Sequence, residues 1–442
     1  MTIERIAVLG AGNAGRAIAA DMTLKGLKVH LFELPEFAES FAPVKQSGEI
    51  TLRGVAREGV ARLELATHDI EAALDGAQLI LIAVPSFGVA PMFEACSTHL
   101  RAGDTVVFTP GAFACFVARN VLAAAGVDID LTLGEICTLP YASRISGPTE
   151  VTVFINAIRL PAAALPAGRT PKVVEAMRQL YPVVQPAANV LDVALLNINP
   201  CIHPGPSILN TGRIEHADDF YLYAEGMTPG TRRVMVAIDQ ERQRVREAWG
   251  LEAPHYGLDP TPGVYEVFEH YFGYGGIDQA GVRLRGPLDM DDRYVTEDVP
   301  YGLVFYAGMG DLVGVDTPHL RRHHQSCLGD QPGRLLELPH GSSQPGSGRQ
   351  VQGRGPGDAV GGSVLSVVAR RVAADRSWPS LRSQCRVRRV SPQSQPSSGA
   401  TRPLPAPPEK MWYSKVQHSI GSLLQAPRRA PHRSPRPVCS LP

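Results

Sequence analysis

The 442-residue sequence lacks any apolar run of the roughly 20 residues that a helix needs to cross a bilayer. Its seven cysteines form no CxxC pair and do not cluster with histidines. This spacing argues against a disulfide framework and against structural zinc, so we predict no metal site. The first residues also lack the basic and then apolar layout of a signal peptide. These absences predict a soluble protein of the cytoplasm.

Charge is balanced over the whole chain but not along it. Residues 319–442 hold 19 lysines and arginines against 5 acidic residues, which leaves 24 basic and 38 acidic residues in the first 318. The same stretch is rich in Pro, Ser, Gly and Gln, and such a composition cannot bury enough apolar surface to offset its ordering entropy. We predict that residues 319–442 are a basic low-complexity tail, disordered or translated from a shifted reading frame. The alternative is a genuine tail that binds nucleic acid or an acidic partner, which the scarcity of aromatics and lysine clusters disfavours.

The first part of the chain alternates strand and helix patterns. Residues 3–33 read as a strand, a glycine turn, a helix and a second strand. The nearly continuous apolar run at 77–86 is typical of a strand buried on both faces of a parallel sheet, and 104–111 and 131–136 are further strand candidates. This alternation predicts an α/β Rossmann domain with a doubly wound parallel sheet over residues 1–186.

From about residue 187 the pattern changes to helices, which predicts an all-helical second domain over residues 187–318 for substrate binding and catalysis. A Thr-Pro pair opens the segment 228–250 in the way that a helix N-terminus does. Another helix is expected within 296–315, with Thr296 or Asp298 as its cap.

The chain opens with a glycine pattern typical of dinucleotide-binding proteins. "GAGNAG" has G-x-G-x-x-G spacing between a predicted strand and helix, where glycines allow the backbone to approach a pyrophosphate at the helix N-terminus. Glu33, at the end of the second strand, can accept hydrogen bonds from the adenosine ribose and repel a 2′-phosphate. No arginine follows it closely, which favours NAD over NADP; a glycine-rich turn without a ligand is the alternative. The candidate cofactor residues are Gly10, Gly12, Asn13, Ala14, Gly15, Glu33 and Pro85.

His203 lies in the segment "NPCIHPGPSILNTGRIE". Pro204 disfavours the α region for His203 and favours an extended backbone, which would fix the direction of a catalytic ring or of an ordinary turn. Asp298, in "RYVTEDVPYG", is a suitable partner to hold a histidine tautomer, but it is also a candidate helix cap. The residues alone leave both interpretations open.

Five segments resemble the octopine/nopaline (opine) dehydrogenase family, in the same order and at similar spacings over about residues 3–318. They are "GAGNAG", "EICTLPYASRISGP", "NPCIHPGPSILNTGRIE", "YAEGMTPG" and "RYVTEDVPYGLV". The resemblance implies an enzyme that joins the amino group of an amino acid to a 2-oxo acid and reduces the imine with NAD(P)H, and that also catalyses the reverse oxidation. It implies that the catalytic histidine falls on His203, its aspartate partner on Asp298, a nearby asparagine on Asn199 and a carboxylate-binding arginine on Arg293. Histidine suits this chemistry because its unperturbed pKa is ~6.5.

The substrates of such an enzyme carry carboxylates, which arginine can bind through two parallel hydrogen bonds. Arg293 is the first candidate and Arg144, in "LPYASR", is the second. An ion pair at the surface or between domains is the alternative for Arg144. We expect small-molecule partners, an amino acid and a 2-oxo acid, with no membrane and no nucleic acid; a homodimer stays open.

Two other functions stay open as well. One is a nucleotide-binding protein without turnover, a redox sensor or a degraded relative, because the resemblance stops near "GVDTPHL", where family members continue with apolar helices. Resequencing the codons for residues 315–325 tests whether an intact alternative frame encodes those helices. The other is a Rossmann ketone reductase of the ketopantoate reductase or glycerol-3-phosphate dehydrogenase kind. Such enzymes place a catalytic lysine in the helical domain, whereas residues 187–318 contain none.

Overall fold

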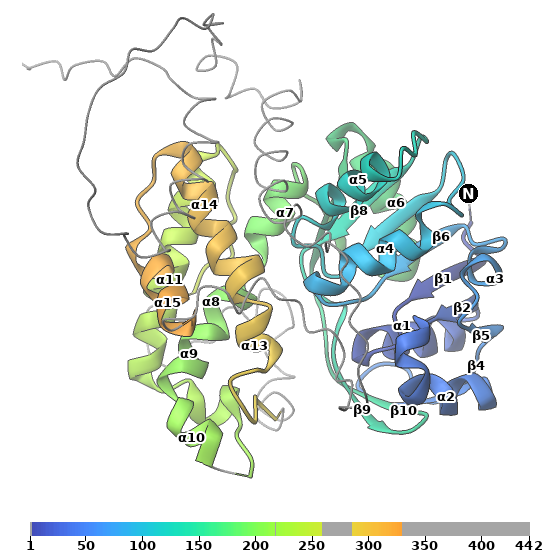
Figure 1. The fold of residues 1–442 in the computed structure, drawn as a ribbon, viewed down its shortest axis with the longest axis horizontal. Coiled ribbons are helices and arrows are strands. Elements are labelled where there is room, and N and C mark those ends of the chain that lie inside the picture. The colour runs from blue at the N-terminus through green and yellow to red at the C-terminus, as the bar shows by residue number, and fades with distance from the viewer. Residues whose placement is uncertain (1, 217, 259–284, 329–442) are drawn as a thin grey trace, which may run out of the picture. The chain divides into compact units, whose positions relative to one another are not determined.

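The computed structural model describes residues 2–216, 218–258 and 285–328. An eight-stranded sheet forms the centre of the N-terminal domain, in the order β12-β11-β8-β7-β6-β1-β2-β5 (Figure 1). Its strands are β1 (Arg5–Leu9), β2 (Lys28–Phe32), β5 (Leu65–Thr67), β6 (Leu79–Ile82), β7 (Thr105–Phe108), β8 (Thr132–Ile136), β11 (Leu160–Leu165) and β12 (Val184–Pro186). The strands from β5 to β8 are parallel, and β11 pairs antiparallel with β8. The predicted strands at 77–86, 104–111 and 131–136 correspond to β6, β7 and β8, so the doubly wound fold is confirmed.

The order of the strands reverses at β1. From β1 the chain builds outward through β2 and β5, then returns to pair β6 with β1 and continues to β7 and β8. In doubly wound folds, ligands bind at the carboxyl ends of the strands beside such a reversal. Topology therefore places the ligand crevice at the ends of β1 and β6.

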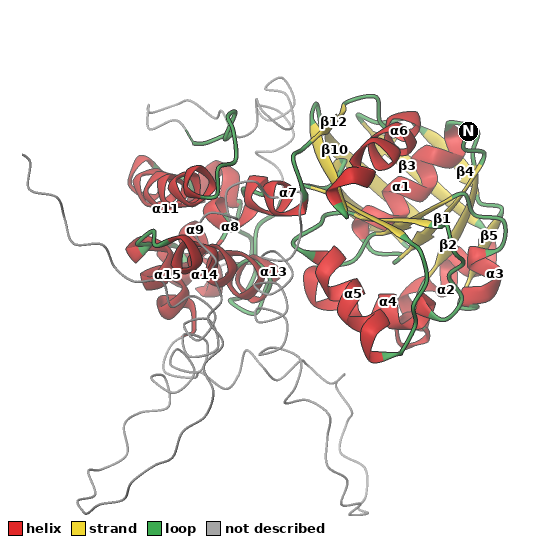
Figure 2. Cartoon of the chain, turned by 90° about the horizontal axis from the view of Figure 1, so that it is seen from above, coloured by secondary structure: helices red, strands yellow, loops and turns green. Residues whose placement is uncertain are grey.

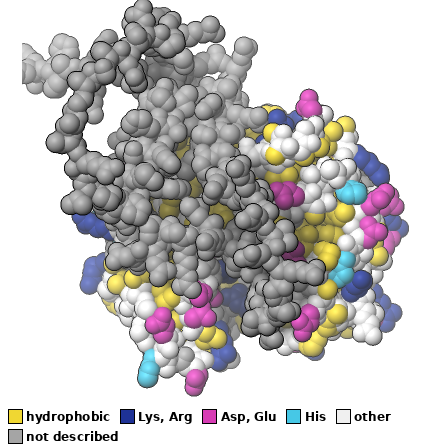
Figure 3. All heavy atoms as spheres, in the orientation of Figure 1, with side chains coloured by type: hydrophobic (Ala, Val, Ile, Leu, Met, Phe, Trp, Pro, Cys, Tyr) yellow, Lys and Arg dark blue, Asp and Glu magenta, His cyan; other side chains and the backbone are white. Residues whose placement is uncertain are grey.

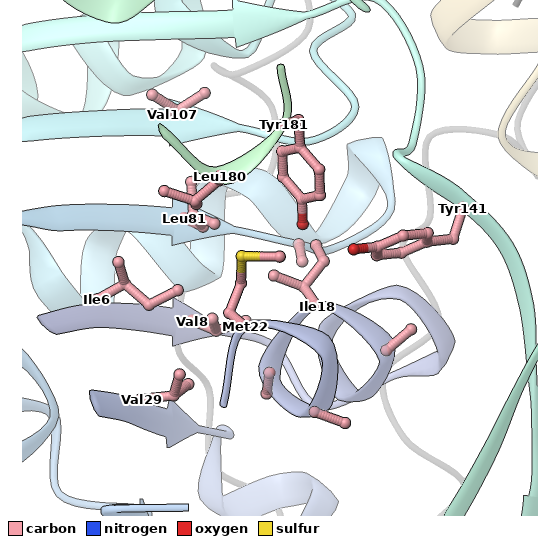
Figure 4. Close-up of a cluster of buried hydrophobic side chains, with 14 of the residues drawn as sticks. Ile6, Val8, Ile18, Met22, Val29, Leu81, Val107, Tyr141, Leu180 and Tyr181 are labelled. Carbon is pink, nitrogen blue, oxygen red and sulfur yellow. The ribbon is translucent and has the colours of Figure 1, made fainter. Parts of the chain in front are cut away.

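Helices cover both faces of the sheet (Figure 2). Helices α1 (Asn13–Leu24) and α6 (Thr170–Leu180) lie on one face, and α4 (Val89–Ser97) and α5 (Ala114–Ala124) lie on the other. Two further helices, α2 (Ala38–Ser47) and α3 (Ile70–Leu74), follow β2 and β5. Ile18 and Met22 of α1 pack against Val8 and Leu81 of the central strands (Figure 4). Their full burial anchors the helix that follows the glycine loop.

A second, four-stranded sheet, which we did not predict, covers α1. Its strands are β3 (Glu49–Gly54), β4 (Gly59–Arg62), β9 (Tyr141–Gly147) and β10 (Glu150–Asn156), in the order β4-β3-β10-β9. Alternate residues of β10, Val151, Val153 and Ile155, are buried, as expected of a strand with one face on the core. Tyr141 of β9 donates a hydrogen bond to the Asp21 carboxylate, which joins this sheet to α1.

The second domain is helical in its described part. Its elements are α7 (Val190–Leu196), α8 (Asn199–Ile202), α9 (Pro204–Leu209), α10 (Thr211–His216), the π-helix η4 (Leu222–Gly226), α11 (Pro229–Ala248), α13 (Arg293–Thr296), the π-helix η7 (Val299–Leu303), α14 (Val304–Val313) and α15 (Pro318–Leu328). The predicted start of the helix at 228 is confirmed, because the Thr228 side chain accepts a hydrogen bond from the Thr231 amide. Among the described helices, none is long and apolar enough to cross a membrane.

Two predicted features of this domain differ from the structure. The single helix expected within 296–315 is divided into the end of α13, η7 and α14, because Pro300 has no amide hydrogen and so favours a new helical start. The predicted boundary between the helical domain and the tail, after residue 318, falls within α15, which runs from Pro318 to Leu328. Leu320 is fully buried, and its amide donates to the Glu241 carboxylate at 2.8 Å, so α15 packs with the helical domain. The rest of the predicted tail lies outside the described residues.

The α/β domain carries charges of both signs on the face that Figure 3 leaves uncovered. Lysine and arginine side chains there are interspersed with acidic and apolar ones. Such mixing is ordinary for the surface of a globular domain.

Candidate active site

The glycine loop lies between β1 and α1, where the topology predicts a ligand. Gly10 has φ +101°, and a side chain there would place Cβ 2.8 Å from the Ala83 carbonyl oxygen. A Cβ on Gly15 would lie 1.7 Å from the Gly10 oxygen, so close packing requires glycine at both positions. A Cβ on Gly12, the N-cap of α1, would meet no atom of the described residues within 4 Å. The loop therefore leaves open space at a helix N-terminus, as a dinucleotide pyrophosphate requires.

Glu33 lies beside this loop, directly after β2. Its Oε2 accepts a hydrogen bond from the Ala11 amide at 2.7 Å and its Oε1 accepts one from the Leu34 amide at 2.9 Å. Burial raises the pKa of Glu33, and the two amides oppose that effect. Each carboxylate oxygen keeps a further lone pair for a ribose hydroxyl.

The other predicted loop residues hold the loop in place. The Asn13 side chain accepts a hydrogen bond from the Ile145 amide of β9 at 2.7 Å, so it joins the loop to the small sheet. Ala14 is the second residue of α1, and Pro85 follows β6 at the adjoining strand end.

Arg16 is a part of this site that we did not predict. It is 2% exposed, and its guanidinium donates to the carbonyl oxygens of Ala11, Pro148 and Ser40 at 2.8, 2.9 and 2.6 Å. A single arginine early in a helix gives no signal of this role in the sequence. The three bonds tie the glycine loop to α2 and to the turn between β9 and β10.

His203 and Asp298 form a buried pair. The His203 Nδ1 lies 2.7 Å from the Asp298 Oδ2, and the two residues are 3% and 8% exposed. An ionised carboxylate only accepts hydrogen bonds, so Nδ1 carries the proton. Asp298 stands at the N-cap position of η7, yet its side chain makes no capping hydrogen bond there. Asp298 therefore occupies the predicted N-cap position, but its carboxylate is hydrogen-bonded to the histidine and does not cap the helix.

The backbone of His203 differs from our prediction. We expected an extended residue before Pro204, but His203 has φ −99° and ψ −57°, which is helical. Its amide donates to the Asn199 oxygen at 2.9 Å, and its carbonyl accepts from the Ser207 amide at 3.0 Å. These helical bonds on both sides outweigh the steric preference of a residue that precedes proline.

Two tyrosines complete the surroundings of His203. The Tyr223 hydroxyl lies 2.8 Å from the His203 Nε2, and the Tyr294 ring stacks on the imidazole with centroids 3.9 Å apart. Burial raises the pKa of Tyr223, so its hydroxyl stays protonated beside the imidazole. We did not predict either residue, although both lie within segments that resemble the family. Tyr223 lies on the π-helix η4, which the 3.6-residue helical period does not indicate.

The two predicted arginines meet at Tyr294. Arg144 Nη2 donates to the Tyr294 hydroxyl at 3.4 Å, and the Arg293 guanidinium lies 5.4 Å from the centre of the Tyr294 ring. Arg293 Nη1 also lies 3.6 Å from the Glu297 carboxylate. The structure thus brings both cations next to the ring that stacks on His203.

A pocket opens beside Asp298, at the carboxyl ends of β6, β7 and β8. The lining residues are Ser86, Pro110, Ala112 and Leu139 from the α/β domain and Asn197, Asn199, Pro200, Arg293, Glu297, Asp298, Tyr301 and Gly302 from the helical domain. The pocket therefore contains three of the predicted site residues, Asn199, Arg293 and Asp298. In the described ranges, no three His, Cys, Asp or Glu side chains group so as to hold a metal ion.

A buried carboxylate that we did not single out shapes one wall of this pocket. Glu135 on β8 has no exposed surface and accepts hydrogen bonds from the amides of Phe113 and Cys115 at 3.2 and 2.7 Å. Burial raises its pKa to about 7. Ala112 and Phe113 have positive φ angles of 116° and 66°, a backbone conformation that residues other than glycine rarely adopt. Glu135 therefore holds this loop in an unusual conformation. The signal in the sequence was a lone charge inside the strand "LTLGEI".

The glycine loop at the strand reversal and the buried histidine and aspartate of the helical domain define a two-domain nicotinamide dehydrogenase. A sequence model described as NAD/NADP octopine/nopaline dehydrogenase, alpha-helical domain, matches residues 186–325. A second, described as NAD-dependent glycerol-3-phosphate dehydrogenase N-terminus, matches residues 5–111. The opine dehydrogenase of Arthrobacter sp. (strain 1C) is 32% identical over 323 residues, which cover 71% of this chain and 86% of the relative.

Solved structures share the fold. An octopine dehydrogenase with NADH and L-arginine has a TM-score of 0.56 and 21% identity, and the match covers 73% of this chain and 88% of that one. A yersinopine dehydrogenase with NADP⁺ bound has a TM-score of 0.53 and 15% identity, with 76% and 91% covered. The chain belongs to the opine dehydrogenase family, as the resemblance in its sequence indicated. It is an NAD(P)-dependent oxidoreductase of the class that acts on CH–NH bonds.

Proposed function

We propose that this protein catalyses the NADH-dependent reductive condensation of an amino acid with a 2-oxo acid to an opine, and the reverse oxidation. The observation that carries the proposal is the buried His203–Asp298 pair beside a pocket at the carboxyl ends of the sheet strands. Membership of the opine dehydrogenase family supports it. The free, buried cysteines of the described residues, Cys96, Cys115, Cys137 and Cys201, are consistent with the cytoplasm as its location.

In this proposal His203 exchanges protons with the reacting oxygen and nitrogen. Because Nδ1–H donates a hydrogen bond to Asp298, proton transfer runs through Nε2 and the Tyr223 hydroxyl that is hydrogen-bonded to it, and the Asp298 carboxylate stabilises the imidazolium. A protonated His203 favours loss of water after carbon–nitrogen bond formation, and the neutral ring takes a proton in the reverse direction. NADH, when bound at the glycine loop, supplies the hydride. Tyr294 holds the imidazole plane by stacking on it.

The two arginines provide positive charge and N–H donors for the substrate carboxylates. Arg293 lines the pocket and is 41% exposed, so its guanidinium can reach a ligand. Arg144 donates a hydrogen bond to the Tyr294 hydroxyl and is the candidate for the second carboxylate. The Asn199 side chain lines the same pocket and can orient a substrate oxygen.

We expect the full-length protein to bind NADH at least ~10-fold more tightly than NADPH. Glu33 would face the 2′-phosphate with a negative charge. Arg16, the buried cation near the loop, already donates to three carbonyl oxygens. Fluorescence titration with both nucleotides measures the preference, and Glu33→Gln should reduce it by strengthening NADPH binding. Glu36→Gln, an exposed change three residues further on, is the matched control. Equal affinity of the wild type for both nucleotides would contradict this role of Glu33.

The reaction itself is tested by its requirement for two substrates. NADH oxidation should be slow with pyruvate alone, absent with amino acids alone and fast with both. Oxidation that needs only the oxo acid would indicate a ketone reductase instead. NADH binding without oxidation under any of these conditions would indicate a nucleotide-binding protein without turnover.

A further inference from the structure

Glu297, one of the residues that line the pocket, has a buried carboxylate oxygen without a hydrogen bond among the described residues. Glu297 is 7% exposed, and its Oε1 accepts hydrogen bonds from the Ser86 amide at 2.9 Å and from the Ser86 hydroxyl at 3.0 Å. Its Oε2 is buried and has no hydrogen-bond partner among the described residues. The closest cation is Arg293 Nη1 at 3.6 Å, which is too far for a hydrogen bond.

The direction of this oxygen is fixed. Rotation of the carboxylate would break both bonds from Ser86, so Oε2 remains beside Arg293 in the pocket that both residues line. A buried carboxylate oxygen that lacks a donor is unfavourable, because it has lost water without gaining a hydrogen bond. A ligand that brings a charged N–H donor to this point would remove that cost.

The neighbouring Arg293 indicates which ligand carries such a donor. The pocket offers an acceptor with negative charge and, 3.6 Å away, a guanidinium that is 41% exposed. An α-amino acid presents an ammonium and a carboxylate on one carbon atom, and so it complements both groups at once. We propose that Glu297 and Arg293 together bind the amino-acid substrate as a zwitterion, with the α-ammonium on the Glu297 Oε2 and the α-carboxylate on Arg293. This inference rests on the proposed function and names the residue that receives the amine.

The same placement makes Glu297 the base for the first chemical step. The ammonium gives one proton to the Glu297 carboxylate, and the freed nitrogen lone pair forms the bond to the carbonyl carbon of the 2-oxo acid. The carbonyl π electrons move to oxygen, which takes a proton from the imidazolium of His203. Burial and the neighbouring Asp298 raise the pKa of Glu297, which favours proton transfer from an ammonium. Two adjacent residues thus take part in one step: Glu297 is the base, and Asp298 supports His203, which is the acid.

The test is Glu297→Gln, which keeps an acceptor for Ser86 but replaces the free carboxylate oxygen with an amide. Binding of L-alanine, L-arginine and L-phenylalanine to the NADH-saturated protein is compared by calorimetry with binding of their des-amino analogues. We expect the variant to lose ~10-fold or more in affinity for the amino acids that the wild type binds, and nothing for the analogues. With pyruvate, kcat/KM for the amino acid should fall ~10²-fold at neutral pH and recover as pH rises, because free amine then replaces the missing base.

Two further variants separate this role from a structural one. Glu252→Gln, at an exposed position, should behave as wild type in every measurement. Ser86→Ala keeps the Glu297 carboxylate, so it should retain the preference for amino acids over their analogues. If Ser86→Ala instead reproduces the affinity loss and the pH profile of Glu297→Gln, Glu297 acts only by holding the loop after β6, and the inference is overturned.

Three other outcomes have distinct meanings. Weaker NADH binding by Glu297→Gln with unchanged amino-acid affinity would assign Oε2 to the nicotinamide carboxamide and overturn the inference. Unchanged values throughout would overturn it as well. If the wild type fails to oxidise NADH with both substrates, the proposed function fails. The binding comparison needs no turnover, so a wild type that shows no preference for amino acids over their analogues overturns the zwitterion site separately.

Discussion

Replacement of His203 by alanine is expected to lower kcat by ~10² to 10⁴-fold, the usual contribution of a positioned acid–base group. NADH affinity should stay close to that of the wild type, because the glycine loop and Glu33 belong to the α/β domain. The measurements are kcat at saturating amino acid, pyruvate and NADH, and the dissociation constant of NADH. His99→Ala, at an exposed histidine of the α/β domain, is the control and should retain full activity.

Asp298→Asn should also lower kcat, since an amide can hold the ring but cannot stabilise imidazolium as a carboxylate does. If the two residues work as one unit, the double variant should be little worse than His203→Ala, because effects within a catalytic unit do not add. Near wild-type turnover in His203→Ala would show that this histidine has only a structural role, which is the alternative that the sequence left open. Additive losses in the double variant would show that the two residues act separately.

The sheet and the cofactor loop could be predicted because their signals are local. A buried parallel strand such as β6 is apolar at every position, and "GAGNAG" lies directly between a strand and a helix. The position of Glu33 could be predicted from the same strand–helix–strand unit, since β2 pairs with β1 and ends beside the loop. Each of these features is determined within about thirty residues, which a sequence pattern can cover.

The small sheet could not be predicted, because its pairing is not local. β3 pairs with β10, so that Thr51 lies opposite Glu150, and neither strand alone has a pattern long enough to indicate the pairing. Arg16 could not be predicted for the same reason, since its bond to Pro148 exists only once this sheet covers α1.

The candidate active site shows the same limit of prediction from sequence. His203 and Asp298 are 95 residues apart, and the resemblance to a family, rather than their own surroundings in the sequence, paired them. The functions of Tyr223, Tyr294 and Glu297 depend on atoms brought from other segments: two contact His203, and Glu297 reaches Ser86. Pro204 gave a misleading signal, because a local steric preference was outweighed by the helical bonds of α8 and α9.

Buried charged groups connect α11 to α7, the helix that precedes α8 and His203. Arg246 is 1% exposed and donates to the Asp192 carboxylate of α7 at 2.8 Å. Arg242 is fully buried, and its Nε donates to the Asp239 Oδ1 at 2.8 Å while another nitrogen donates to the Leu195 carbonyl of α7. α7 leads directly into α8 and His203, so these pairs position the segment that carries the proposed catalytic residue.

Asp239→Ala is expected to lower the free energy of unfolding by ~3–5 kcal/mol, because it removes a carboxylate that is paired with the buried Arg242. It also removes the Asp239 Oδ2, which accepts hydrogen bonds from Gln243 and from the Leu258 amide at 2.7 Å each. Urea unfolding followed by tryptophan fluorescence measures the change, since Trp249 directly follows α11 and is the one tryptophan of the described residues.

The control for that experiment is an exposed ion pair. Glu49→Ala removes the partner of Arg62 at 3.0 Å, where the two side chains are 40% and 83% exposed, and it should cost at most ~1 kcal/mol because water replaces the lost contact. Adding Arg242→Leu to Asp239→Ala should restore part of the stability, since an apolar side chain carries no unpaired charge. A cost below ~1 kcal/mol for Asp239→Ala alone would mean that water reaches Arg242 and that this pair does not hold the catalytic segment in place.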